Sequence, residues 1–144
     1  MIKKVIRTLA FIIIVVLLMG GFLMTINPIR RSTGSIRRSL LREMPIGTSM
    51  EDVIQIIESN RAWTLKVVQM EFGLVLSPVG NNMIPIRDVN PSGFPNSPVV
   101  GEKSIRIHMG RYITFTWVDV EAYFAFDGEG YLLDIFIRKE LDVI

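Results

Sequence analysis

The feature that most constrains this chain is an uncharged apolar run near its N-terminus. Residues 9–26 read LAFIIIVVLLMGGFLMTI, with no charged side chain and a single hydroxyl, that of Thr25. A helix rises about 1.5 Å per residue, so this run spans about 27 Å, close to the thickness of a bilayer's hydrocarbon core. A helix also satisfies its own backbone hydrogen bonds, as lipid requires. The run therefore predicts one N-terminal transmembrane helix.

A cleaved signal peptide is the alternative, because Lys3, Lys4 and Arg7 form a basic stretch ahead of the run. The run is longer than a usual signal-peptide core, and no small-x-small cleavage site follows it. The chain also has no cysteine for lipoprotein processing. We therefore expect an uncleaved anchor in residues 1–29, followed by a basic juxtamembrane segment and a single domain in residues 30–144.

Positive charge flanks the apolar run on both sides, so it does not decide the orientation. An N-terminal helix led by a short basic tail usually keeps that tail in the cytoplasm, which places the domain outside. The alternative is a cytoplasm-facing domain whose basic segment binds anionic lipid. In both cases the candidate lipid head-group contacts are the five arginines that follow the run: Arg30, Arg31, Arg37, Arg38 and Arg42.

Charge is divided unevenly along the chain. Residues 1–44 hold eight Lys/Arg and one acidic residue, a net +7, whereas residues 45–144 hold eight Lys/Arg and thirteen Asp/Glu, a net −5. Anionic lipid attracts the first part and repels the second. The basic charge belongs to the membrane-proximal part, so the partner that the charge predicts is membrane lipid, and nucleic acid is disfavoured.

Two helices are expected after Asn27-Pro28. The first begins with Ser35 as its N-cap and ends before Pro45; its apolar side either touches lipid or packs on a sheet. The second follows a capping pair, Thr48 with Glu51 or Ser49 with Asp52. Its apolar residues then recur at helical spacing: Met50, Val53, Ile54 and Ile57.

The rest of the chain predicts strands. Alternating apolar residues indicate strands near residues 63–72, 103–109, 112–126 and 131–141, with a turn at Asp127–Gly130. Residues 73–101 contain five prolines and predict a long loop, whose apolar residues either pack back on the sheet or await a partner. The expected fold is α+β, with two helices on an antiparallel sheet of about four strands, a two-layer sandwich.

Two segments resemble a known family. PIGTSMEDVIQII is similar to the opening of the second helix in SmpA/OmlA-type (BamE-like) lipoproteins, with matching residues Gly47, Thr48, Ser49, Glu51 and Val53. VEAYFAFDGEGYLLDIFI resembles their closing hairpin. The same layout occurs in the β-lactamase inhibitor protein, hence the term BLIP-like fold. The resemblance implies a non-enzymatic domain that binds proteins or helps assemble envelope complexes. An apolar anchor in place of the lipidated cysteine looks more like a membrane-anchored version from Gram-positive bacteria.

Catalytic side chains are few. His108 is the only histidine and there is no cysteine, which excludes His/Cys metal clusters and Cys-His nucleophile pairs, and we predict no cofactor and no enzymatic activity. One carboxylate cluster is worth naming: Asp119 and Glu121, about 7 Å apart on one strand face, with Asp134 on the neighbouring strand.

Paired carboxylates at such a spacing could act as acid and base on a glycoside, so a cell-envelope hydrolase is an alternative function. Asp119 and Glu121 alternate with Val118 and Val120, however, which predicts that the acids occupy the solvated face beside cross-strand partners such as Arg138.

Overall fold

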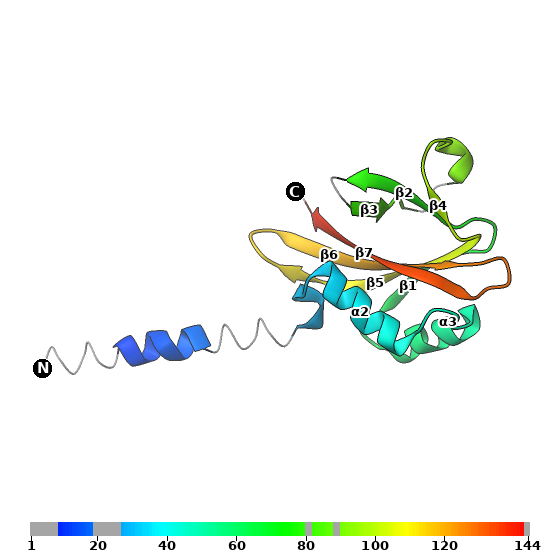
Figure 1. Cartoon of the computed structure of the whole chain (residues 1–144). Coiled ribbons are helices and arrows are strands. Elements are labelled where there is room, and N and C mark those ends of the chain that lie inside the picture. Colours follow the sequence, from blue (N-terminus) through cyan, green and yellow to red (C-terminus); the bar gives the residue numbers. More distant parts are fainter. Residues whose placement is uncertain (1–8, 19–26, 80–81, 88–89, 143–144) are drawn as a thin grey trace, which may run out of the picture.

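The computed structural model describes residues 9–18, 27–79, 82–87 and 90–142 (Figure 1). Residues 9–18 are helical. Among the residues described, no helix is both long enough and apolar enough to cross a membrane. The rest of the predicted anchor, residues 19–26, and the basic tail, residues 1–8, lie outside the described residues.

A four-stranded antiparallel sheet forms the centre of the domain. Its order is β1-β5-β6-β7, so the last three strands form a meander and β1 pairs only with β5. The predicted α+β class and four-stranded antiparallel sheet are confirmed. The strand bounds are β1 Thr64–Gln69, β5 Lys103–Ile113, β6 Trp117–Phe126 and β7 Leu132–Asp142.

Helices cover one face of this sheet: the short 3-10 helix η1 (Pro28–Arg30), α2 (Thr33–Glu43) and α3 (Met50–Ser59) (Figure 1). Strand alternation points the even-numbered residues of β6 toward these helices. The main core consists of buried side chains from both layers, including Ile36, Leu40, Met44, Val53, Ile57, Ile105, Ile107, Val120, Ala122, Phe124, Phe126 and Leu132. The predicted apolar face of β6 is confirmed. The apolar side of α2 packs on the sheet.

The first predicted helix begins earlier than expected. Its N-cap is Ser32, whose Oγ accepts a hydrogen bond from the Ser35 backbone N–H at 3.3 Å, so Ser35 lies in the first turn. Gly34, two residues after this cap, also lies inside the helix. The prediction of Ser35 as the cap was wrong because η1 delivers the chain to Ser32 in an extended conformation, one residue ahead of a helical start.

The second helix uses one of its two possible capping pairs. Ser49 Oγ accepts from the Asp52 backbone N–H at 3.2 Å and donates to Asp52 Oδ2 at 2.7 Å. Thr48 Oγ1 instead donates to the Pro45 carbonyl at 2.6 Å, within the turn that precedes the helix. The helix therefore begins at Met50.

Ser49→Ala is expected to lower the free energy of unfolding by about 1 kcal/mol, because the α3 N-terminus loses its capping acceptor. The measurement is urea unfolding of the full chain in detergent, followed by far-UV circular dichroism. Ser39→Ala, at an exposed position inside α2, is the matched control and should change the midpoint little. Equal effects of the two substitutions would contradict the capping role.

Residues 73–101 are not a continuous loop, contrary to our expectation. They contain strands β2 (Leu74–Val79), β3 (Asn82–Pro85) and β4 (Val99–Val100), paired in the order β3-β2-β4, and the 3-10 helix η2 (Pro91–Gly93). The prolines concealed these strands, since proline lacks an N–H for the ladder. Pro85 lies on the edge strand β3, where a proline is tolerated.

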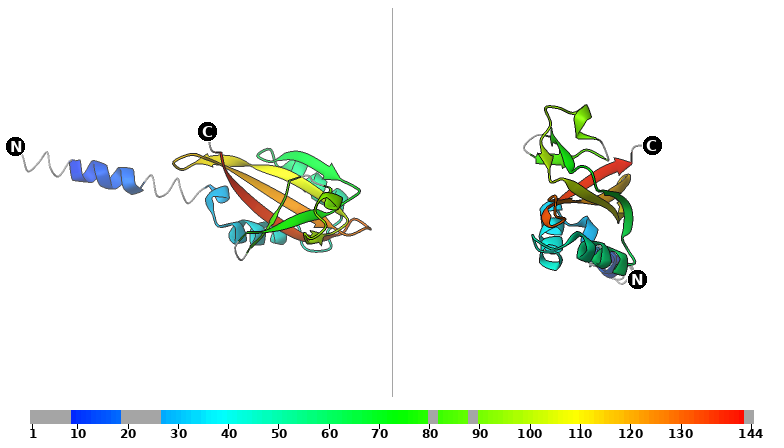
Figure 2. Two further views of the ribbon diagram at one scale, coloured as in Figure 1. Left: turned by 90° about the horizontal axis from the view of Figure 1, so that it is seen from above. Right: turned by 90° about the vertical axis from the view of Figure 1, so that its right-hand side faces the viewer.

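This small sheet covers the face of the central sheet that the helices leave open (Figures 1 and 2). Leu74 and Leu76 are buried against Tyr123 and Ala125 of β6. The apolar residues of the segment therefore pack back on the sheet, one of our two alternatives. The domain has three layers, helices, central sheet and small sheet, so the two-layer description was wrong.

The strand predicted for residues 112–126 is also divided. β5 runs on to Ile113 through a register shift between His108 and Gly110, and β6 begins only at Trp117. The turn between them is closed by the Thr114 N–H, which donates to the Thr116 carbonyl at 2.9 Å. Its residues, Thr-Phe-Thr, favour strands and carry no glycine or proline, so the sequence gives no turn signal there.

Candidate functional site

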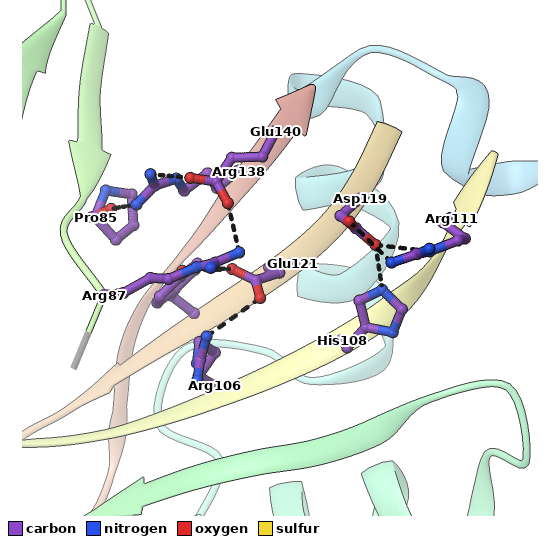
Figure 3. Close-up of polar contacts among 10 residues, drawn as sticks. Pro85, Arg87, Arg106, His108, Arg111, Asp119, Glu121, Arg138 and Glu140 are labelled. Carbon is purple, nitrogen blue, oxygen red and sulfur yellow. Dashed lines mark hydrogen bonds and ion pairs between the residues drawn. The ribbon is translucent and has the colours of Figure 1, made fainter. Parts of the chain in front are cut away.

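The candidate carboxylates Asp119 and Glu121 lie on the face of β6 that points toward the small sheet (Figure 3). Their neighbours on β5 are basic: His108 lies opposite Glu121 and Arg111 opposite Asp119 in the ladder. The two acids therefore sit in a row of cations between the two sheets.

Glu121 is buried, with 7% of its side chain exposed. Its Oε2 accepts from Arg87 Nε at 3.1 Å and from the Tyr123 hydroxyl at 2.7 Å, and its Oε1 accepts from Arg106 Nη1 at 3.2 Å. The expectation of a solvated side chain was wrong, because the chain that follows β3 folds over this position and brings Arg87 with it (Figure 3).

The polar network continues to Glu140, which forms ion pairs with Arg87 and with Arg138. Arg138 lies opposite Glu121 in the ladder, as expected, but its ion-pair partner is Glu140, and its Nη1 donates to the Pro85 carbonyl at 2.9 Å. Three of these contacts join the small sheet, or the chain that leaves it after β3, to the central sheet: Arg87 to Glu121, Arg87 to Glu140 and Arg138 to Pro85. The network therefore holds the small sheet against the central sheet.

Two pKa values follow from this network. Burial lowers the pKa of the Arg87 guanidinium, but the charges of Glu121 and Glu140 outweigh burial and raise it above its ordinary value. Burial, together with the hydrogen bond to Glu121, raises the pKa of the Tyr123 hydroxyl far above its ordinary value. Both groups therefore keep their protons at neutral pH, and each donates a hydrogen bond to the Glu121 carboxylate.

Asp119 forms a separate cluster nearer the β5–β6 hairpin (Figure 3). His108 Nε2 lies 3.0 Å from its Oδ1, and Arg111 donates through Nε to Oδ1 at 3.1 Å and through Nη2 to Oδ2 at 3.2 Å. Burial raises the pKa of the Asp119 carboxyl, but the hydrogen bond from His108 and the charge of Arg111 outweigh it and leave that pKa below its ordinary value.

Asp119→Asn is expected to lower the midpoint of thermal unfolding at neutral pH, with the deficit vanishing in acid. A carboxyl whose pKa is lower in the folded state adds stability above its unfolded value, here 3.8, and loses it as the pH falls through the folded value. The measurement is the difference in melting temperature between wild type and variant, which should be steady above about pH 5 and shrink below about pH 4. A difference that stays constant down to strong acid would contradict this role.

Asp134 does not join the other two acids. It lies opposite Ala125, four residues along β6 from Glu121, which is about 13 Å. Its Oδ1 accepts from Arg37 Nε at 3.2 Å and from Arg37 Nη2 at 2.5 Å, and Arg37 Nε also donates to the Ile135 carbonyl at 2.9 Å. The three carboxylates are thus distributed over three separate sets of basic partners.

The five arginines proposed for lipid contact are divided as well. Arg30 Nη2 donates to the Ile113 carbonyl at 3.0 Å, with its guanidinium 5.2 Å from the centre of the Tyr112 ring, and Arg37 is held by Asp134. The remaining three, Arg31, Arg38 and Arg42, are exposed. The fold therefore uses two of the five to hold elements together and leaves three at the surface.

Two open grooves of about 510 Å³ each mark the surface. One follows β7 between α2 and β3, and Arg37, Ile84 and Phe136 line it. The other lies between η1, α2 and the start of β1, where Ile29, Leu40 and Trp63 line it. Across the described ranges, no group of three or more His, Cys, Asp or Glu side chains is placed to hold a metal ion.

One surface feature was not predicted from the sequence. The hairpin between β5 and β6 exposes three apolar side chains: Ile113 at 52%, Phe115 at 89% and Trp117 at 41%. The signal was a Thr-Phe-Thr-Trp stretch with no charge, but it was read as the middle of a strand, where half of the residues would be buried.

No family model, no curated protein and no solved structure matches this chain. Gly47, Thr48 and Ser49, which resemble the BamE-like motif, form the turn and the N-cap ahead of α3. The Gly47 N–H donates to the Leu132 carbonyl at 2.8 Å, so this turn is tied to the start of β7 and, with it, to the closing hairpin. The two segments that carry the resemblance are therefore in direct contact.

Proposed function

We propose that this chain is a membrane-anchored, non-enzymatic binding or assembly module of the cell envelope, with its domain outside the cytoplasm and a BLIP-like fold. One observation carries the proposal: the sequence passes from the apolar run straight into an element packed on the domain. Asn27, the residue after that run, caps η1 by accepting a hydrogen bond from the Ile29 N–H at 3.2 Å.

The junction is held at several points. Ile29 is buried in the main core, Arg30 donates to the Ile113 carbonyl, and Lys139 Nζ donates to the Arg31 carbonyl at 2.6 Å. A membrane helix that ended at Ile26 would leave no free linker, so the domain would stand at the bilayer surface in a set orientation. Such an arrangement suits a module that presents one surface to a neighbour in the same envelope.

The polar contacts support a binding role over the hydrolase alternative. A general acid on a glycoside needs a raised pKa in an apolar pocket. Asp119 instead has a lowered pKa, and Glu121 receives three hydrogen bonds that join the two sheets. These carboxylates have a structural use that accounts for their presence.

The partner surface we favour is the outer side of residues 90–99. The helices and the small sheet cover the two faces of the central sheet, which leaves this stretch as the outermost part of the added layer (Figure 1). Phe94 and Val99 are exposed there at 37% and 44%. In this arrangement the long segment, rather than an uncovered face of the sheet, contacts the envelope protein.

The orientation is tested with a reporter fused after Ile144. We expect an alkaline phosphatase fusion to be active, because that enzyme folds only outside the cytoplasm, and a β-galactosidase fusion to be inactive. Carbonate extraction of the same cells checks the anchor, and the protein should remain in the membrane pellet. The opposite reporter pattern would overturn the orientation, and release by carbonate would overturn the anchor.

The partner surface is tested with a photo-crosslinking amino acid placed at Phe94 in the full chain. We expect a reproducible crosslink to one envelope protein from this position. The control position is Glu58, an exposed residue of α3 on the opposite layer, which should give no such product. Identical products from both positions, or none from either, would count against residues 90–99 as the contact.

A further inference from the structure

We propose that the β5–β6 hairpin is a second membrane contact, whose apolar tip inserts into the interface of the bilayer that holds the anchor. We define the tip as Ile113, Phe115 and Trp117. The proposal rests on the anchoring proposed above, and it assigns the hairpin tip to contact with lipid.

The tip has the composition of an interfacial contact. Phe115 at the turn is 89% exposed, and Ile113 and Trp117 pair at the base of the turn at 52% and 41% exposure. Leu141 lies opposite Val118, the residue that follows Trp117, and is also 52% exposed at this end of the sheet. Tryptophan favours the boundary between head groups and acyl chains, where its N–H stays wet and the rest of the ring is apolar, and phenylalanine inserts its apolar ring on the acyl-chain side of that boundary.

Cations surround the base of the tip. Arg111 lies 5.8 Å from the centre of the Trp117 ring, and Arg30 and Lys139 lie 5.2 and 5.1 Å from that of Tyr112. Arginine and lysine at this level can reach lipid phosphates while the apolar tip lies deeper.

The acidic residues nearby offset the charge of Arg111 but not that of Arg30 or Lys139. Asp119 is paired with Arg111 and His108, and Glu140 with Arg138 and Arg87. Asp142 lies opposite Trp117 in the ladder, at the end of β7. Among the described residues, Arg30 and Lys139 are the cations at the base of the tip that are not paired with an acid, since their side chains donate to the Ile113 and Arg31 carbonyls.

The position of the tip selects lipid as the occupant. Arg30, four residues beyond the apolar run, is hydrogen-bonded to the Ile113 carbonyl at 3.0 Å, so the tip and the entry of the chain are in contact. Figure 1 and the left-hand view of Figure 2 place the β5–β6 hairpin at the end of the domain where the chain enters at Asn27, and the β6–β7 hairpin at the other end. A membrane that holds the run directly before Asn27 would lie beside this tip.

The test follows the fluorescence of Trp117 in the full chain, reconstituted into phosphatidylglycerol–phosphatidylethanolamine vesicles that contain phosphatidylcholine brominated on its acyl chains. Trp63→Phe in every sample leaves Trp117 as the sole tryptophan. We expect the emission to shift to shorter wavelength and to lose most of its intensity to the brominated lipid. Phe115→Ser should reverse much of both changes without affecting the fold, because that side chain packs on little of the domain.

The matched control moves the tryptophan to the other end of the sheet. The variant with Trp63→Phe, Trp117→Phe and Tyr131→Trp places the sole tryptophan at a residue that is 47% exposed beside the β6–β7 turn. That position is separated from the tip by the length of β6, about 30 Å. Its emission should be insensitive to bromine, and equal quenching at both positions would overturn the proposal.

Vesicle flotation in the same samples separates the two levels of inference. Protein that floats with the vesicles while bromine leaves Trp117 unquenched overturns the membrane contact and leaves the anchor standing. Protein that fails to float overturns the anchor itself, and the contact that rests on it. A short-wavelength emission that bromine does not quench, and that depends on protein concentration, would assign the tip to a second copy of the chain and overturn the proposal.

Discussion

Glu121→Ala is expected to lower the free energy of unfolding by about 3–5 kcal/mol, because it removes one member of a buried set of ion pairs. The substitution removes the acceptor shared by Arg87, Arg106 and Tyr123, and the side chains of Arg106 and Glu121 are only 16% and 7% exposed. Two guanidinium groups would then lie near each other without this carboxylate. For a domain of this size the melting temperature should fall by roughly 10–20 °C.

The matched control for this prediction is Glu140→Ala. Glu140 also pairs with Arg87, but 33% of its side chain is exposed, so water can replace the lost contact. We expect a loss of about 1 kcal/mol or less. Thermal unfolding of the full chain in detergent, followed by circular dichroism, measures both variants. Similar melting temperatures for the two would show that burial of Glu121 contributes little, contrary to the structure.

Gly101→Ala is expected to destabilise the domain by a similar amount, about 3–5 kcal/mol, because two penalties coincide. Gly101 has φ +76°, a conformation that other residues adopt at a cost, and a Cβ there would lie 2.4 Å from the Phe126 carbonyl oxygen. That oxygen accepts the Glu102 N–H at 2.7 Å, so the contact cannot relax without breaking the junction between β4 and β5.

Gly93→Ala is the control for Gly101. A Cβ at Gly93 meets nothing within 4 Å, so the substitution should be nearly neutral. Urea unfolding midpoints of the two variants should therefore differ widely. Because Gly101 closes the segment that carries the small sheet, its variant should also give faster proteolysis between residues 73 and 101. Equal midpoints would indicate that this junction is looser than the structure implies.

The central sheet and its helices could be predicted from local patterns. The i, i+3, i+4, i+7 spacing of Met50, Val53, Ile54 and Ile57 predicts α3, and the alternation along residues 118–126 predicts the core face of β6. The α3 pattern has one exposed and one buried side, and along β6 the acidic residues Asp119 and Glu121 alternate with apolar ones, so both segments show a regular period in the sequence. The turn at residues 127–130 then predicts the pairing of β6 with β7, whereas the turn between β5 and β6 has no such signal in the sequence.

The small sheet could not be predicted from the sequence. Because it was missed, the candidate carboxylates were predicted to face solvent. Both faces of β6 are buried between Val120 and Phe126, but the odd-numbered face there includes the charged residue Glu121, which the sequence pattern predicts to be solvated. Its partner Arg87 comes from a proline-rich segment 34 residues earlier, and no local pattern links the two. Arg37 and Asp134 are 97 residues apart and present the same difficulty. Long-range ion pairs leave no periodic signal.

The two borders of the central sheet have a consequence for copies of this chain gathered in one membrane. On β1 the register shifts between Leu65 and Val67, so the exposed Lys66 interrupts the ladder, and on β7 the carbonyl of Ile135 is already taken by Arg37. A border interrupted in this way is a poor template for another strand. Proteins confined to a membrane meet often. These features would keep such encounters from joining the central sheets of several copies edge to edge.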